Sequence, residues 1–399
     1  MSAPLSGLRI LDFCWIGAGA LVTKALAELG AEVIRIESRS HPDNLRLTPP
    51  FRPGTNGLEA SGYFASRNPD KKSFALNMST EEGREIAREL VAEADAVTSN
   101  FRPGVMERWG LSYEEVKKLN PEIIYLVMPM QGSNGPHRSF IGFGSTIAAL
   151  GGLVSLSGLP GRVPVGTGTH YPDHVPNPGH SLVGFLAALF EKQQSGRGQR
   201  VELSQLESTV NIIGPAFLGD SVDVELTASG NRVEGVVPRG VFQTSDDGWL
   251  VIACADDVQW AALTDVLDFP DDWAGMDIAS REEHIDEIER AVGEKVAGAS
   301  LAELAGRLDL AGVPHGPVST STDLLADERL KERAFWHEIE HPVIGTMPMF
   351  RIPFKREAGS RGPMTRPPLL GEHTWEIASK ILGMERERFD ALTEAKVLY

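Results

Sequence analysis

The sequence predicts an α/β protein whose first 130 residues form a doubly wound domain around a parallel sheet. In this region, short apolar segments typical of buried strands alternate with segments of helical periodicity. Glycine turns and helix-capping pairs mark where one element ends and the next begins. A strand, a turn, a helix and a second strand within about thirty residues form a βαβ unit, which implies parallel strands.

The first βαβ unit spans residues 8–37. Residues 8–13 are typical of a buried strand, a helical pattern follows up to Gly30, and residues 32–37 are typical of a second strand. The turn after the first strand carries Gly17 and Gly19 without a third glycine, so it is a weak dinucleotide-binding fingerprint. Spacing alone favours a tight strand-to-helix turn.

The alternation continues after a stretch rich in proline and asparagine at residues 41–72. Ser79 with Glu82 forms a capping box for the next helix, and Ser112 with Glu115 repeats it. The further strands expected in this part of the chain are residues 73–76, 96–99 and 123–128.

Small residues dominate residues 141–161, which we expect to be a helix that permits close approach of a backbone or a ligand. A helix up to Gln194, a strand at 201–203 and a helix capped by Ser204 and Glu207 follow.

The character of the sequence changes near residue 227. Two strands are expected at 237–242 and 249–254, joined through a turn at 246–248. Acidic amphipathic helices at about 256–310 and a connector at 311–318 follow, and residues 336–399 end in another helix.

Composition limits the possible partners. The 399 residues carry a net charge of −17, which argues against nucleic acid and anionic membranes. No apolar run approaches the ~20 residues of a membrane span, and the N-terminus lacks signal-peptide features, so we expect a cytoplasmic protein. Cys14 and Cys254 form neither a disulfide framework nor a zinc motif, and no cluster has metal-ligand spacing, so no metal is expected.

Asp173 is the candidate catalytic residue. It lies in a loop at residues 166–179 that holds three prolines, and His170 and His174 stand on either side. An aspartate in such a loop is more often a turn or cap residue than a catalyst. The functional alternative is a nucleophilic carboxylate, which opens a thioester or phosphoester through a covalent acyl intermediate.

The candidate anion site follows a predicted strand. Phe101 and Arg102 lie in a turn at the carboxyl edge of the sheet, where such folds bind ligands, and Arg108 comes soon after. The arginines could receive phosphate while Phe101 stacks on a base. Arg108 as a solvated helix residue is an equally good interpretation. Three further cations could join this site, namely Arg39, Lys71 and Lys72.

Several stretches, in order over nearly the whole chain, resemble the family III CoA-transferases of the CaiB/BaiF type, which include formyl-CoA and carnitine CoA-transferases. The first two are Leu-Ser-Gly-Leu-Arg-Ile-Leu-Asp-Phe at 5–13 and Leu-Gly-Ala-Glu-Val-Ile-Arg-Ile-Glu at 29–37. The others are Asn-Phe-Arg-Pro-Gly at 100–104, Ser-Gly-Arg-Gly-Gln at 195–199 and Pro-Leu-Leu-Gly-Glu-His-Thr at 368–374.

The resemblance implies a mechanism and an architecture. Asp173 lies where the family carries its catalytic aspartate, which forms an aspartyl-acyl anhydride and then an aspartyl-CoA thioester. An anhydride is as activated as a thioester, so the transfer needs neither ATP nor a metal. The implied fold is a Rossmann-like large CoA-binding domain, residues 1–226 completed by 320–399, with a smaller α+β domain at 227–319. Two ring-like subunits would interlock as a homodimer.

The family's CoA contacts imply a set of binding residues here. Coenzyme A thioester is expected as a substrate, with no tightly bound cofactor, and a carboxylic acid as the acceptor. Ser38 stands where some members carry an arginine, so Arg39 is assigned in its place. The implied contacts are Ile16, Gly17, Ala18, Arg39, Leu76, Asn77, Met78, Ser79, Asn100, Phe101, Arg102 and Arg108.

Differences from the family's sequence pattern bear on which acyl group the enzyme would transfer. Residues 128–132 lack a Ser-Gly-Phe-Gly turn, and the glycine-rich insertion of formyl-CoA transferase is absent, so formyl or oxalyl transfer is not expected. Residues 171–173 and 204–207 are more similar to members that act on larger organic acids such as dicarboxylates or aromatic acids. A 2-methylacyl-CoA racemase is the nearest alternative, but residues 142–146 hold neither the histidine nor the aspartate of that group. A non-catalytic CoA-binding protein and CoA transfer within one dicarboxylate also remain open.

Overall fold

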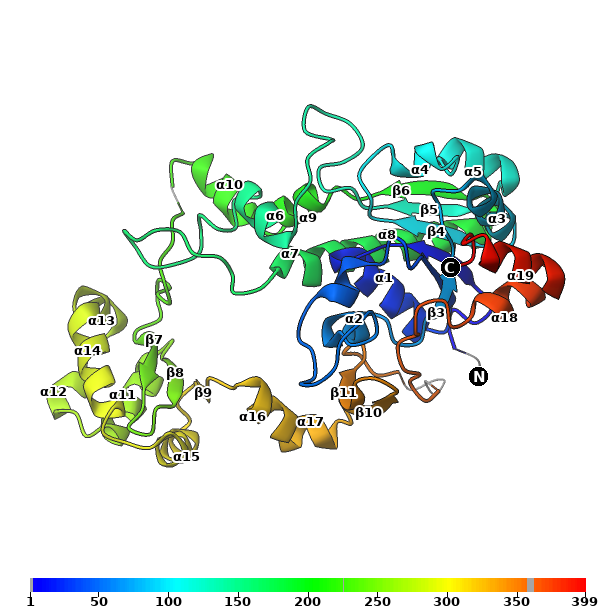
Figure 1. Ribbon diagram of the computed structural model, residues 1–399. Helices are drawn as coiled ribbons and strands as arrows, with labels where there is room; N and C mark the ends of the chain where they lie inside the picture. Colours follow the sequence, from blue (N-terminus) through cyan, green and yellow to red (C-terminus); the bar gives the residue numbers. More distant parts are fainter. Residues whose placement is uncertain (1–2, 225, 357–361) are drawn as a thin grey trace. The chain divides into compact units, whose positions relative to one another are not determined.

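The computed structural model describes residues 3–224, 226–356 and 362–399 (Figure 1). The chain forms two compact units. The first comprises residues 1–154, 166–224 and 331–399, and the second comprises residues 155–165 and 225–330. The chain therefore leaves the first unit twice and returns to it each time.

The first unit is built on a six-stranded sheet in which every paired strand is parallel. The strand order is β3-β2-β1-β4-β5-β6, so the order reverses between β1 and β4. The doubly wound sheet predicted from the alternation of strands and helices is confirmed. The strands are β1 (Arg9–Phe13), β2 (Glu32–Glu37), β3 (Lys72–Ala75), β4 (Ala96–Ser99), β5 (Ile124–Val127) and β6 (Gln199–Glu202).

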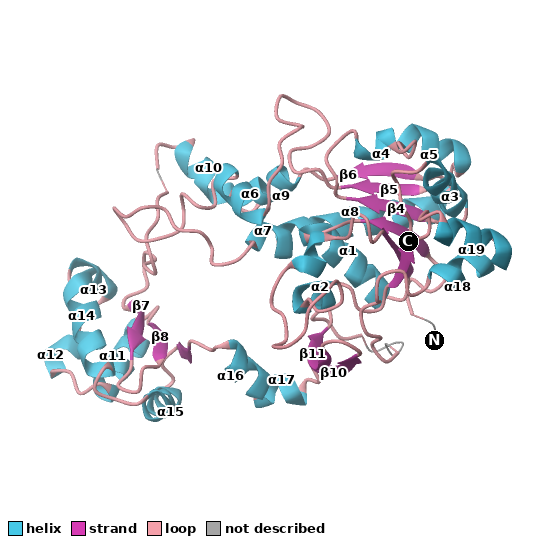
Figure 2. Cartoon of the chain, in the orientation of Figure 1, coloured by secondary structure: helices cyan, strands magenta, loops and turns pink. Residues whose placement is uncertain are grey.

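Helices cover both faces of this sheet (Figure 2). Because side chains alternate along a strand, Ile10 and Leu11 of β1 enter two different apolar cores. Ile10 packs with α1 (Gly17–Glu28) and α8 (Pro176–Ser195). The longer helices that contribute to the core around Leu11 are α3 (Glu81–Ala92), α5 (Tyr113–Leu119), α18 (Thr374–Lys380) and α19 (Arg386–Glu394), and the short α4 (Val105–Arg108) adds Met106.

Short elements complete the first unit. Two strands, β10 (Trp336–His341) and β11 (Gly345–Phe350), pair as an antiparallel hairpin that the sequence did not predict. The 3-10 helix is η1 (Asn44–Leu47), and the short helices are α2 (Gly62–Arg67), α4 (Val105–Arg108), α6 (Gly144–Leu150), α7 (Tyr171–His174), α9 (Gln205–Asn211) and α10 (Gly214–Asp220). Helix α17 (Glu328–Glu332) crosses residue 330, where the second unit ends.

The second unit holds a three-stranded sheet in the order β7-β8-β9. Its strands are antiparallel, with the predicted turn at 246–248 joining the first two. Its core surrounds the fully buried Trp260, whose indole N–H donates to the carbonyl of Trp273 at 2.6 Å. The elements are β7 (Arg239–Gln243), β8 (Trp249–Ala253), β9 (His315–Pro317), α11 (Asp257–Val266), α12 (Asp271–Ala274), α13 (Ile278–Glu283), α14 (Ile285–Val296), α15 (Leu301–Ala311) and α16 (Ser321–Ala326).

Three local predictions were wrong. Helix α3 is capped by Thr80, whose hydroxyl accepts from the Gly83 N–H at 3.0 Å. The hydroxyl of Ser79, the predicted cap, instead donates to Asn77 Oδ1, which also accepts from the Ser79 N–H. The helix expected over 141–161 is limited to α6, which ends where Gly152 adopts a φ of 79°. The connector at 311–318 contains β9, which pairs with β8. The caps at Ser112 and Ser204 are confirmed.

Candidate active site

The carboxyl ends of β1 and β4 lie side by side where the strand order reverses, which is the usual ligand site of such sheets. The residues after these strands are tied together. Asn100 accepts from the Trp15 N–H at 2.9 Å and donates to the Trp15 carbonyl at 2.6 Å. The ring of Phe101 then packs edge-on against Trp15, with centroids 5.2 Å apart. The two loops therefore form one rigid edge.

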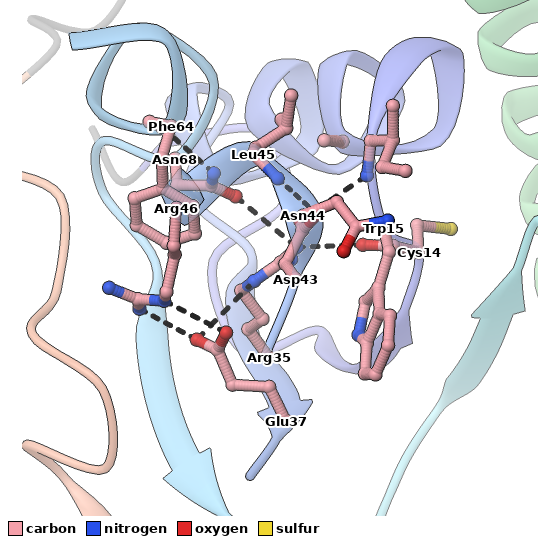
Figure 3. A network of polar contacts seen from close by, with 12 residues as sticks. Cys14, Trp15, Arg35, Glu37, Asp43, Asn44, Leu45, Arg46, Phe64 and Asn68 are labelled. Carbon is pink, nitrogen blue, oxygen red and sulfur yellow. Dashed lines mark hydrogen bonds and ion pairs between the residues drawn. The ribbon is translucent and has the colours of Figure 1, made fainter. Parts of the chain in front are cut away.

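A buried ion-pair network lies beside the loop after β1 and forms hydrogen bonds with it (Figure 3). Arg35 donates to the Cys14 carbonyl at 2.7 Å and forms an ion pair with Asp43. The same Asp43 carboxylate accepts from the Ile16 N–H at 3.2 Å. Ile16 has a φ of 55°, a conformation that β-branched residues rarely adopt, so this hydrogen bond holds a strained residue in place.

Asp173 lies in the short helix α7 and its side chain is buried against two glycines. Its Oδ2 accepts from the Gly144 N–H, the first residue of α6, at 3.0 Å. A Cβ on Gly17 would stand 3.1 Å from Oδ2, and a Cβ on Gly144 would stand 2.8 Å from it. The sequence therefore places glycine at both positions where a side chain would press on this carboxylate.

The surroundings of Asp173 shift the pKa of two groups. Burial raises the pKa of the Asp173 carboxyl, although the Gly144 N–H, His170 and Arg67 oppose the shift. Burial together with Arg67 lowers the pKa of His174 to about 4, so His174 is neutral at physiological pH. His174, the next residue of α7, therefore adds no formal charge near the Asp173 carboxylate.

Two cavities meet at Trp15 and Phe101. The first has a volume of about 290 Å³ and contains Asp173 in its wall. The predicted site residues that line it are Ile16, Gly17, Ala18, Asn100, Phe101, Arg102 and Asp173. The second has a volume of about 210 Å³, and its predicted site residues are Leu76, Asn77, Met78, Ser79 and Phe101.

Two predicted site residues line neither of these two cavities. Arg39 is exposed, and its backbone N–H donates to the carbonyl of Tyr399 at 3.0 Å. Arg108, the last residue of α4, lies with its guanidinium 3.3 Å from the Cβ position of Gly104. The structure brings the other predicted residues together around the two cavities.

Lys71 and Lys72 do not join the anion site, contrary to the prediction. Lys71 is buried, with its ammonium 2.7 Å from the Thr23 hydroxyl and 3.3 Å from Asp12, and burial lowers its pKa to about 8. Lys72 is the first residue of β3, so it lies at the opposite end of that strand from the cavities. Its ammonium pairs with Glu32 at 2.9 Å and Glu376 at 3.1 Å.

Sequence reasoning missed Gln205 and Arg67. Gln205 lines the cavity of Asp173, donates to the Met128 carbonyl at 2.7 Å and follows β6, a position at the carboxyl edge that could have flagged it. Arg67 donates to His174 Nε2 at 2.9 Å. It ends a segment without hydrophobic periodicity, and no sequence signal distinguishes it from a surface arginine.

Neither a metal site nor a membrane-crossing helix occurs among the described residues. Within residues 3–224, 226–356 and 362–399, no three His, Cys, Asp or Glu side chains gather so that they could hold a metal ion. Over the same ranges, no helix combines the length and apolar character required to cross a membrane.

Comparisons with known proteins agree with the resemblance. A family model described as CoA-transferase family III matches residues 5–374. The beta subunit of succinyl-CoA–L-malate CoA-transferase from Chloroflexus aurantiacus is 30% identical, over 99% of this chain and 98% of the relative. Human succinyl-CoA:glutarate CoA-transferase is 28% identical, over 99% of this chain and 90% of the relative.

A solved structure extends the match to the fold. The crystal structure of a CaiB/BaiF family protein from Brucella suis superposes with a TM-score of 0.87 at 28% identity, covering 96% of this chain and 100% of that one. With a family model that spans 5–374 and relatives matched end to end, the chain belongs to CoA-transferase family III and is a CoA-transferase enzyme.

Proposed function

We propose that this enzyme moves CoA from an acyl-CoA thioester to a carboxylic acid, with the Asp173 carboxylate as the nucleophile. The observation that carries the proposal is the buried Asp173 carboxylate, held by the Gly144 N–H at 3.0 Å in the wall of a 290 Å³ cavity. Because glycines lie on either side, no side chain at these positions blocks the carboxylate from attacking the carbonyl carbon of a bound thioester. A carboxylate in such a site needs no metal to act as a nucleophile.

The proposed reaction has four balanced steps. Asp173 attacks the thioester carbonyl, which expels CoA thiolate and leaves an aspartyl-acyl anhydride. The thiolate attacks the aspartyl carbonyl, releasing the first acid and leaving an aspartyl-CoA thioester. The acceptor carboxylate attacks that thioester, which expels CoA thiolate and leaves a second anhydride. The thiolate then attacks the acyl carbonyl of this anhydride and displaces the Asp173 carboxylate. The new acyl-CoA then leaves and the Asp173 carboxylate is restored.

Backbone N–H groups supply the electrostatic part of this proposal. Negative charge develops on the attacked carbonyl oxygen in each step, and preorganised N–H donors stabilise it. Helix α1 begins at Gly17 and has no side-chain cap, so the N–H groups of its first turn are available beside the cavity. Gly144 meanwhile fixes one oxygen of Asp173 and leaves the other to react.

The two cavities suit the two ends of an acyl-CoA. We assign the thioester to the cavity of Asp173 and the nucleotide end to the cavity lined by Leu76 through Ser79, with Phe101 between them. Arg39 and Arg108 stay proposed contacts for phosphate groups at the margin of these cavities. Coenzyme A enters as substrate, and no tightly bound cofactor is proposed.

A dicarboxylate is the proposed acid substrate. Relatives matched over nearly their whole length are named for succinyl-CoA together with L-malate or glutarate. The absence of the glycine-rich insertion argues against formyl or oxalyl transfer, and residues 171–173 and 204–207 resemble members that act on larger organic acids. Transfer of CoA between two carboxylates of a single substrate would use the same aspartate and remains compatible with this proposal.

Racemization is the less favoured alternative. A racemase of this fold places a histidine base in the stretch that corresponds to residues 142–146. Here Gly144 occupies that stretch, and even a Cβ there would stand 2.8 Å from Asp173 Oδ2 and from His170 Cβ. A basic side chain at Gly144 would therefore collide with the carboxylate.

We further propose the interlocked homodimer, with the large CoA-binding domain at 1–226 and 320–399 and the small domain at 227–319. Exposed apolar side chains support contact with a second copy, namely Val183 and Phe190 on α8 and Phe217 and Leu218 on α10. The cytoplasmic location stays a prediction from the sequence.

The test is intact mass spectrometry after incubation with a panel of acyl-CoA thioesters, headed by succinyl-CoA, with hydroxylamine in parallel. The wild-type enzyme is expected to yield an acyl or CoA adduct, or a hydroxamate, on the peptide that contains Asp173. Asp173→Asn should lose every adduct while retaining its melting temperature, whereas Asp271→Asn, an exposed control in the second unit, should behave as wild type. Full adduct formation by Asp173→Asn would overturn the mechanism.

A further inference from the structure

A polar cluster surrounds the ring of His174, the residue that follows Asp173 in α7. Arg67, the last residue of α2, donates to His174 Nε2 at 2.9 Å. The Tyr63 hydroxyl lies 3.4 Å from the same nitrogen, and the guanidinium of Arg67 stands 5.2 Å from the centre of the Tyr63 ring. The Thr169 hydroxyl lies 3.1 Å from His174 Nδ1.

The protonation of this cluster follows from its donors. A guanidinium only donates, so His174 Nε2 is an acceptor and the single ring proton is on Nδ1, directed to the Thr169 hydroxyl. His174 is neutral because its pKa is about 4. The hydrogen bond from Arg67 to His174 therefore orients the guanidinium without neutralising it.

Arg67 differs from the other arginines near the sheet in its lack of an anionic partner. Arg35 and Arg46 are buried and form ion pairs with Asp43 and Glu37 respectively. Among the described residues, no carboxylate lies within ion-pair distance of Arg67, and its Nε is buried without a hydrogen-bond partner. A half-buried cation with unused donors favours an anionic ligand.

The reaction itself removes the nearest negative charge. Asp173 and His174 are consecutive residues of α7, and the Arg67 guanidinium bound to His174 is close enough to oppose the rise in the pKa of the Asp173 carboxyl, the group that becomes acylated. In the anhydride and the thioester, that carboxylate no longer carries a charge. Only an anion on the substrate would then complement the guanidinium, and an ionised carboxylate matches its planar fork.

We propose that Arg67, assisted by the Tyr63 hydroxyl, binds the free carboxylate of a dicarboxylic acyl group whose other end reacts with Asp173. This inference rests on the proposed transferase function and names the residue that selects dicarboxylic over monocarboxylic substrates. Arg67 acts here as a binding residue for substrate, and His174 positions it.

The test compares two thioesters that differ at one end of the acyl chain. Succinyl-CoA carries a free carboxylate where butyryl-CoA carries a methyl group. The rate of adduct formation on the Asp173 peptide is measured with each, for the wild type, Arg67→Met and Arg67→Lys. Because a charge-assisted hydrogen bond is lost, the succinyl-to-butyryl ratio of the second-order rate constants for adduct formation is expected to fall about 10- to 100-fold in Arg67→Met.

Arg67→Lys keeps the charge but not the fork, so its ratio is expected to lie between those of the wild type and Arg67→Met. It also carries the test if Arg67→Met does not fold. Equal loss with both thioesters, leaving the ratio unchanged in both variants, would show that Arg67 acts on Asp173 alone and would overturn this inference. Absence of any adduct in the wild type would instead overturn the transferase proposal and this inference with it.

Discussion

Gly144→Ala probes whether the position of the Asp173 carboxylate controls the reaction. Gly144 is the first residue of α6, and its N–H donates to Asp173 Oδ2 at 3.0 Å. An added Cβ would lie 2.8 Å from that oxygen and 2.8 Å from the Cβ of His170. Because ordinary contact begins at 3.4 Å, the carboxylate must retreat by about 0.6 Å.

A displacement of this size is large for a nucleophile. A misplacement of about 1 Å costs about 100-fold in rate, so Gly144→Ala is expected to slow acylation of Asp173 about 10- to 100-fold. Folding should survive, because the φ of Gly144 is outside the left-handed range and alanine favours a helix over glycine by about 1 kcal/mol. The loss should therefore appear in the chemical step rather than in the melting temperature.

The assay is single-turnover acylation, in which the extent of acylation in quenched samples is measured by intact mass spectrometry. The affinity for CoA is measured separately by calorimetry. Gly179→Ala is the matched control, because Gly179 lies in the first turn of α8 close to Asp173 in sequence and a Cβ there has nothing within 4 Å. We expect wild-type rates from the control. Acylation at the wild-type rate by Gly144→Ala would refute the claim that this contact holds the reactive carboxylate.

Two further predictions concern the groups around the cavity. Asp43→Asn removes the closest buried ion-pair partner of Arg35, so the free energy of unfolding in urea should fall by about 3 kcal/mol. The substitution also weakens the acceptor for the Ile16 N–H, so CoA should bind more weakly. Asp390→Asn is the control, because Asp390 forms an exposed ion pair with Arg386, and it should change the free energy of unfolding by less than about 1 kcal/mol. Equal losses of stability in the two variants would contradict the reasoning. The folded-state pKa of His174, about 4, lies below its ordinary 6.5, so its contribution to stability is complete above pH 6.5 and lost as the pH falls towards 4. Unfolding measured across this range should show a smaller pH dependence in His174→Gln, and an unchanged slope would contradict the assignment.

The order of the strands and helices could be predicted from the sequence because it depends on local patterns. Apolar runs such as residues 8–13 have only one way to be buried in an α/β domain, and caps such as Ser112 and Ser204 satisfy helix N–H groups within four residues. Where two local solutions competed, the sequence misled. Asn77 and Thr80 between them displaced Ser79 from the cap position of α3, a choice that side-chain geometry makes.

The electrostatic roles of the cations could not be read from spacing. Lys71 and Arg67 are four residues apart, yet Lys71 is held by Asp12 and Thr23, while Arg67 is left without an anion beside Asp173. The sequence analysis proposed Lys71, and not Arg67, as a cation of the anion site. Burial and partners, which come from residues distant in the sequence, reversed that choice.

The sequence by itself determined the family, the doubly wound sheet and the identity of Asp173 as the residue to test, because these follow from motif order and local periodicity. Only the tertiary structure decided that Gly17 and Gly144, 127 positions apart, both approach one carboxylate. It alone also decided that Asp43 holds Ile16 and that Arg67 reaches His174. The physical reason is that such contacts depend on where the fold brings distant segments together, and no local pattern encodes a distance between them.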